Sequence, residues 1–146
     1  MKKIFLFIIV LLISNSCSAQ NNIDFYYQNK TQATKTDSIG YKFYLENTSK
    51  EFLKNDSEVL LFFNNAAFID DVITINGKRY NFDNYICGYR EIKTFKGNGK
   101  IEITSNKKEK MEFSLKKGID YIIIDGNFDN KWSVTFSEYF PIMECL

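Results

Sequence analysis

The alternation of apolar and polar side chains is clearest over Ile119–Phe136, and it predicts a β-hairpin there. The first strand carries the continuous β-branched run Ile122–Ile124, which is typical of a strand buried on both faces. The second strand places Trp132, Val134 and Phe136 on one face, between serine and threonine residues on the other. An intervening segment rich in Asp, Asn and Gly supplies the turn. This hairpin therefore predicts a hydrophobic core and carries no catalytic pattern.

Further segments have the short apolar runs of β-strands. They are 41–45, 58–63, 72–75, 78–82, 100–104 and 110–115. Two of them flank Asn76 and Gly77, the dipeptide that best supports the positive φ angles of a two-residue hairpin turn. Thr48 and Glu51 have the spacing of a helical capping box, which predicts one helical turn within residues 46–55.

About eight short strands, roughly ten residues apart and without a long helix between them, predict an all-β fold. We expect an antiparallel β-sandwich that is immunoglobulin-like or transthyretin-like in general architecture. A small β-barrel has the same periodicity and stays open as an alternative. The expected order is a signal peptide at 1–19, a polar linker or edge segment at 20–40 and the sandwich domain at 41–146.

The first residues have the pattern of a signal peptide for export. Lys2 and Lys3 precede the unbroken apolar run Ile4–Ile13, and a stretch of mostly small residues follows it. The apolar run is too short to span a bilayer as a helix. We therefore expect an exported bacterial protein.

Two cleavage sites fit this pattern. Cys17 and Ala19 occupy the small-residue positions before a cleavage site, which would release a soluble secreted protein beginning at Gln20. The segment Ile13–Cys17 also resembles a bacterial lipoprotein signal, in which the cysteine after the apolar run is acylated and becomes the new N-terminus. The resemblance implies cleavage before Cys17 and an anchored protein of the periplasm or outer membrane. Cysteine is scarce in the chain, so its place directly after the apolar run favours the lipoprotein.

The charge balance does not favour nucleic acid as a partner. Removing residues 1–19 takes away two of the 19 basic residues and none of the 18 acidic ones, which changes the formal net charge from +1 to −1. Proteins that bind nucleic acid usually carry a basic surface. We expect instead a protein or glycan partner in the cell envelope, contact with the membrane only through the lipid anchor, and no cofactor.

The chain contains no histidine, so it lacks the Ser-His-Asp and Cys-His nucleophile systems and the histidine metal sites. Carboxylates at turn positions are the remaining candidates for acid–base chemistry, namely Asp70, Asp71, Asp83 and Asp120. Ser105–Lys108 and Ser114–Lys117 match the Ser-x-x-Lys spacing of a nucleophile with its base, but neither is predicted to start a helix.

One turn has the spacing of a cation site. Asp125, Asn127 and Asp129 resemble the first half of an EF-hand calcium loop, with oxygen ligands at positions one, three and five. The second half of such a loop is not present. A weak cation site and an Asx-rich turn are both compatible with this pattern.

Two cysteines remain as thiols after processing. In an oxidising envelope, Cys87 and Cys145 are candidates for a disulfide that closes a loop of about 59 residues. On the chain-entropy estimate such a bond stabilises the fold by roughly 4 kcal/mol.

Tyrosines where strands meet polar loops are the binding candidates, chiefly Tyr80, Tyr85 and Tyr89. A phenol ring offers a flat apolar surface with a polar edge, which suits a sugar or a peptide. We therefore expect a small, exported, non-enzymatic binding or accessory β-sandwich module. The alternatives are a carboxylate- or calcium-dependent enzyme or metal-binding module, and a purely structural envelope lipoprotein.

Overall fold

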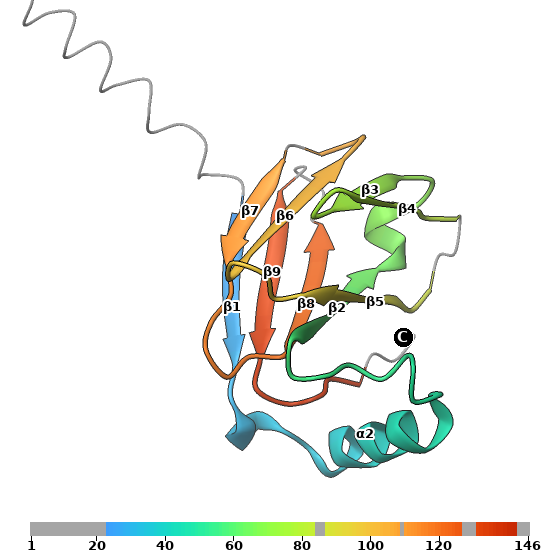
Figure 1. Ribbon diagram of the computed structural model, residues 1–146, viewed down its shortest axis with the longest axis vertical. Coiled ribbons are helices and arrows are strands. Elements are labelled where there is room, and N and C mark those ends of the chain that lie inside the picture. The colour runs from blue at the N-terminus through green and yellow to red at the C-terminus, as the bar shows by residue number, and fades with distance from the viewer. Residues whose placement is uncertain (1–22, 84–86, 109, 127–130, 143–146) are drawn as a thin grey trace, which may run out of the picture.

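The computed structural model describes residues 23–83, 87–108, 110–126 and 131–142. Within these residues the strands form two sheets that pack face to face, and the α-helix α2 lies below the strand ends in the view of Figure 1. The elements are β1 (Ile23–Gln28), η1 (Lys30–Gln32), α2 (Lys35–Asn47), β2 (Glu58–Asn64), η2 (Asn65–Phe68), β3 (Val72–Ile75), β4 (Lys78–Asn81), β5 (Tyr89–Phe95), β6 (Lys100–Ser105), β7 (Met111–Ser114), β8 (Tyr121–Gly126) and β9 (Trp132–Ser137).

The strand order confirms the two-layer β-sandwich. Sheet A has the order β1-β9-β8-β2-β5, and sheet B has the order β4-β3-β6-β7. Sheet B is antiparallel throughout, as expected. Sheet A is mixed, because β1 pairs with β9 and β2 pairs with β8 in parallel. Both sheets have free edges among the described strands, so they do not close into the alternative barrel.

The predicted hairpins are present. β8 and β9 pair antiparallel over six residue pairs, from Tyr121 with Ser137 to Gly126 with Trp132. β3 and β4 join through Asn76 and Gly77, whose φ angles of 47° and 83° are the positive values that this turn requires. Local sequence preferences were therefore sufficient to define these hairpins.

The core between the sheets is built around an aromatic cluster. Phe68 of η2 is fully buried, with its ring centroid 5.4 Å from Phe63, 5.8 Å from Phe82 and 5.6 Å from Trp132. Isoleucines from both sheets surround this cluster. β2 is buried on both faces because its outward residues are also covered.

A second, smaller cluster covers part of the outer face of sheet A. It joins Leu60 and Phe62 of β2 to Tyr44 of α2 and to Phe140, which follows β9. Gly40 faces the segment after β9 so closely that a Cβ atom there would overlap the side chain of Ile142. The segment 139–142 thus holds α2 against the sheet.

The expected strand at 41–45 is wrong, because these residues lie in α2. Thr34 caps the helix and Asp37 completes a capping box, while Thr48 ends the helix instead of starting a helical turn. Residues 23–28, expected as a linker or edge segment, form the edge strand β1. No helix in the described part of the chain is long and apolar enough to cross a membrane.

We expect Phe140→Ala to lower the free energy of unfolding by about 3 kcal/mol, because it leaves a cavity between four aromatic rings. Urea unfolding monitored by circular dichroism measures this change. Phe95→Ala is the matched control, since the Phe95 side chain is 65% exposed and its loss should change stability little. Equal effects of the two substitutions would contradict the role assigned to Phe140.

Candidate functional site

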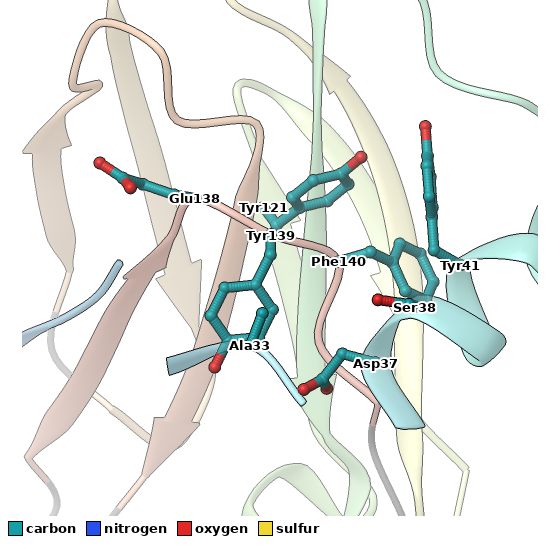
Figure 2. A pocket seen from close by; sticks show the side chains of 8 residues that line it. All are labelled: Ala33, Asp37, Ser38, Tyr41, Tyr121, Glu138, Tyr139 and Phe140. Atoms are coloured by element: carbon teal, nitrogen blue, oxygen red, sulfur yellow. The ribbon is translucent and has the colours of Figure 1, made fainter. Parts of the chain in front are cut away.

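A pocket of about 220 Å³ lies where the start of α2 meets the end of sheet A (Figure 2). We call it the Tyr41 pocket. It is lined by Ala33, Asp37, Ser38, Tyr41, Tyr121, Glu138, Tyr139 and Phe140. These residues come from three places in the chain: the first turns of α2 and the link before it, the first residue of β8, and the segment after β9.

Aromatic rings form most of the wall of the Tyr41 pocket. The centroid of the Phe140 ring is 5.5 Å from both Tyr41 and Tyr121, and Tyr41 meets Tyr121 edge to face at 6.4 Å. Figure 2 shows the ring of Tyr139 on the other side of the pocket, near Ala33. Aromatic walls of this kind suit a flat, partly apolar ligand.

The turn after β9 places Tyr139. The buried hydroxyl of Ser137 donates a 2.7 Å hydrogen bond to the Tyr139 carbonyl and accepts one of 3.3 Å from the Tyr139 N–H. This local loop directs the chain from β9 across the sheet toward α2. A single serine at the end of a strand therefore decides where two pocket residues lie.

Asp37 joins the helix to the end of the described chain. Its Oδ2 atom accepts hydrogen bonds of 2.7 Å from the Thr34 N–H and hydroxyl, and its Oδ1 atom accepts one of 3.2 Å from the Ile142 N–H. Partial burial alone raises the pKa of Asp37, but the hydrogen bonds from Thr34 and Ile142 outweigh it and hold the pKa below its usual value. Asp37 is therefore an ionised structural contact at neutral pH.

Glu138 is also a structural contact, at another part of the rim of the Tyr41 pocket. It accepts hydrogen bonds of 3.1 Å from the Lys30 N–H and 2.9 Å from the Tyr27 hydroxyl, which lower its pKa in that order. Figure 2 shows its carboxylate directed away from Tyr41 and Phe140. A general acid needs a pKa raised toward the working pH. Neither Asp37 nor Glu138 has a raised pKa.

Two tyrosines of the pocket, Tyr121 and Tyr139, keep their protons. Burial, and after it the Tyr41 hydroxyl, raise the pKa of Tyr121 well above its usual value. Burial and the nearby Asp37 carboxylate raise the pKa of Tyr139. Both hydroxyls are therefore neutral at physiological pH and can donate hydrogen bonds to a ligand.

The tyrosines predicted as a binding face lie on different sheets. Tyr80 belongs to β4 of sheet B, where Lys78 and Arg90 lie over its ring at 5.4 Å and 6.0 Å. Tyr89 belongs to β5 of sheet A and packs against the outer cluster. Tyr85 lies outside the described residues. Arg90, which follows Tyr89 on β5, connects the two edge strands through the Tyr80 ring. The binding role of Tyr80 and Tyr89 stays a prediction.

Asp125, the first residue of the predicted calcium loop, is at the end of β8. Its two carboxylate oxygens accept hydrogen bonds of 3.1 Å from the Asn64 side-chain amide. Asn127 and Asp129 lie outside the described residues, and the described residues contain no cluster of three or more acidic, cysteine or histidine residues that could hold a metal. The calcium site therefore stays a prediction.

The other carboxylates have different surroundings. Asp71 is buried and accepts hydrogen bonds from the Ser105 hydroxyl at 2.5 Å and the Asn106 N–H at 3.1 Å. Asp120 forms ion pairs of 2.8 Å with Lys54 and 2.7 Å with Lys96. Asp70 lies in the turn after η2, and Asp83 follows β4. The contacts of Asp71 and Asp120 join neighbouring loops and give these two acids structural roles.

The Ser-x-x-Lys pattern at Ser105 is part of a turn. The hydroxyl of Ser105 donates to Asp71 and accepts hydrogen bonds from the N–H groups of Lys107 and Lys108 at 2.9 Å and 3.0 Å. Ser114 ends β7. In the known motif the nucleophilic serine starts a helix. Neither Ser105 nor Ser114 does so.

Cys87 is disulfide-bonded. Cys145 and the lipidation candidate Cys17 both lie outside the described residues, so the pairing of Cys87 with Cys145 and the acylation of Cys17 stay predictions. The Cys87 carbonyl also accepts a 3.1 Å hydrogen bond from the Asn65 side chain, which ties this turn to η2.

Sequence reasoning missed the Tyr41 pocket because it placed Tyr41 in a strand. The signal that could have found the helix is the pair Thr34 and Asp37, which has capping-box spacing with aspartate in place of the usual glutamate. Nothing in the local pattern links Tyr41 to Tyr139. Their proximity depends on the path of the chain after β9.

We expect Asp37→Asn to lower the free energy of unfolding by about 1–2 kcal/mol at neutral pH, since it weakens the capping box and the contact with Ile142. The folded-state pKa of Asp37 lies below the ordinary 3.8, so this stabilisation is present above pH 3.8 and is lost as the pH falls through the folded pKa. Urea unfolding across this range should show the two proteins converging in acid. Asp24→Asn, an exposed carboxylate on β1, is the control and should have no such effect.

Comparison with known proteins adds no family to this description. The chain matches no protein-family model, and no curated protein and no solved structure is significantly similar to it. The function must therefore be argued from the pocket itself.

Proposed function

We propose that the protein is a non-enzymatic binding module of a bacterial cell envelope, and that the Tyr41 pocket binds one ring of a glycan. The observation that carries this proposal is the combination of aromatic walls with rim carboxylates that are already engaged in structural hydrogen bonds. Such a site offers surfaces and neutral hydroxyls for binding. It does not offer a free acid or base.

The size and chemistry of the pocket favour a sugar ring. At about 220 Å³ the pocket is smaller than the roughly 300–1,000 Å³ typical of sites for drug-sized molecules. A sugar ring has an apolar face that can lie on Tyr41 or Tyr139, and hydroxyls that can accept from the neutral phenol of Tyr121. The ring clusters around Phe140 hold these side chains in place before a ligand arrives.

We expect Tyr41→Ala and Tyr139→Ala each to weaken saccharide binding about tenfold or more, because each removes one aromatic wall. NMR titration with neutral hexoses, N-acetylhexosamines and their disaccharides, followed on the backbone amides of residues 33–41, measures this effect. Tyr26→Ala is the matched control, since Tyr26 is a 56% exposed tyrosine of β1 that does not line the pocket.

Three results would overturn this proposal. They are the absence of any saccharide response at the pocket, an equal effect of Tyr26→Ala, and pocket binding only by a peptide that presents an aromatic side chain. In the last case the pocket would serve a protein partner instead of a glycan.

The proposed route to the envelope is export followed by lipid anchoring at Cys17. Five residues separate Cys17 from the start of β1, and such a segment spans at most about 20 Å. Ile23 is level with Trp132 at one end of sheet A, whereas Gln28 is level with Ser137 at the other end, toward α2 (Figure 1). The Tyr41 pocket lies at this second end, because Glu138 and Tyr139, which follow Ser137, line it. An anchored domain would therefore direct its pocket away from the membrane.

We expect Cys17→Ser to move the protein from the membrane fraction to the soluble fraction, because it removes the acylation site. Intact mass spectrometry of both fractions tests this, and the unsubstituted protein should carry the mass of acyl chains on Cys17. A soluble unsubstituted protein that begins at Gln20 would instead establish secretion without an anchor.

A further inference from the structure

A second recess shares Phe140 with the Tyr41 pocket, and we call it the Phe43 hollow. It has a volume of about 350 Å³, within the range of small-molecule sites. It is lined by Ile39, Gly40, Phe43, Phe62, Tyr89, Glu91, Phe140, Pro141 and Ile142. Ile39 and Phe43 are one helical turn apart and are 58% and 66% exposed, so the hollow opens to solvent along α2.

Among the described residues that line the Phe43 hollow, Glu91 alone carries a charge. It lies on β5 between Tyr89 and Lys93 on the outer face of sheet A, opposite Phe62 of β2. Partial burial raises the pKa of Glu91, and no hydrogen bond or ion pair to a described residue opposes that rise. The residue as a whole is still exposed, so a ligand can reach it.

Lys93 on β5 and Lys42 on α2 are engaged elsewhere. The Nζ atom of Lys93 is 3.7 Å from a Glu58 oxygen and donates to the carbonyls of Glu51 and Leu53 at 2.9 Å and 3.2 Å. On α2, Lys42 pairs with Glu46 at 3.7 Å. Glu91 therefore has no ion-pair partner among the residues that the structure describes, and it lies beside an apolar surface.

Aromatic rings at the base of the hollow add to its affinity for a cation. Phe62 and Phe140 meet edge to face at 5.5 Å, and Phe43 and Tyr89 complete the lining. The face of an aromatic ring attracts an ammonium group, most strongly where water is partly excluded. A carboxylate beside apolar and aromatic walls is complementary to a ligand with a hydrocarbon stem and a positive end.

We propose that the Phe43 hollow binds an alkylammonium group, with its hydrocarbon stem against Phe43 and Phe140 and its cation at the Glu91 carboxylate. A lysine side chain of a partner and a free polyamine both present this group. The proposal does not depend on saccharide binding in the Tyr41 pocket, because the two recesses share only Phe140.

Titration of the purified protein with n-hexylammonium and with n-hexanol tests the proposal, since the two probes share a hydrocarbon chain and differ in charge. We expect n-hexylammonium to bind at least about tenfold more tightly, with NMR shifts at residues 39–43 and 89–92. Glu91→Gln should remove this preference and leave the weak binding of n-hexanol unchanged. Cadaverine and a lysine-containing peptide capped at both ends then distinguish the two sources of the group.

Glu46→Gln is the matched control, because it removes the same charge from an exposed pair on α2 that does not line the hollow. It should leave the binding of both probes unchanged. Equal affinity for n-hexylammonium and n-hexanol, binding of neither probe, or equal effects of Glu91→Gln and Glu46→Gln would each overturn the proposal. Phe43→Ala adds a second check, since it should weaken both probes together.

Discussion

The packing of Phe140 among the rings of Tyr41, Tyr44, Phe62 and Tyr121 is the interaction on which the outer layer of the molecule depends. α2 buries only one residue, Tyr44, so the helix has little surface of its own to hold it on sheet A. Phe140 supplies this contact from the segment that follows β9. Gly40 has no side chain, which lets Ile142 of the same segment come close to the helix. Both recesses beside α2 exist because Phe140 forms a wall of each.

The carboxylates around α2 separate into two kinds. Asp37 and Glu138 accept hydrogen bonds from backbone N–H groups and hydroxyls, and their pKa values are lowered as a result. Glu91 has no such donor in the described part of the chain, and burial raises its pKa. The first kind holds chain segments together. By our proposals, the neutral rings of the Tyr41 pocket and the Glu91 carboxylate of the Phe43 hollow are the binding groups, which would give the two recesses different chemical preferences.

The candidate site was largely inaccessible to prediction from sequence. Tyr41 was expected in a strand, because the apolar spacing of 41–45 is too short to separate a strand from a helix. Tyr139 lies almost a hundred residues from Tyr41, and only the Ser137 turn after β9 brings them together. Tyrosine was a chemically reasonable choice for a binding residue. The sequence pattern, however, selected Tyr80 and Tyr89, which lie on different sheets.

The sequence by itself determined the local units of the sandwich. The Asn76-Gly77 turn, the alternation on β9 and the apolar run of β2 each depend on neighbouring residues, and all three are present as expected. The tertiary structure decided which units pair, including the parallel contacts of β1 with β9 and β2 with β8. It also decided that the weakly amphipathic residues 35–47 become a helix, which Phe140 holds against sheet A. These outcomes depend on contacts between residues far apart in the chain, which local periodicity does not encode.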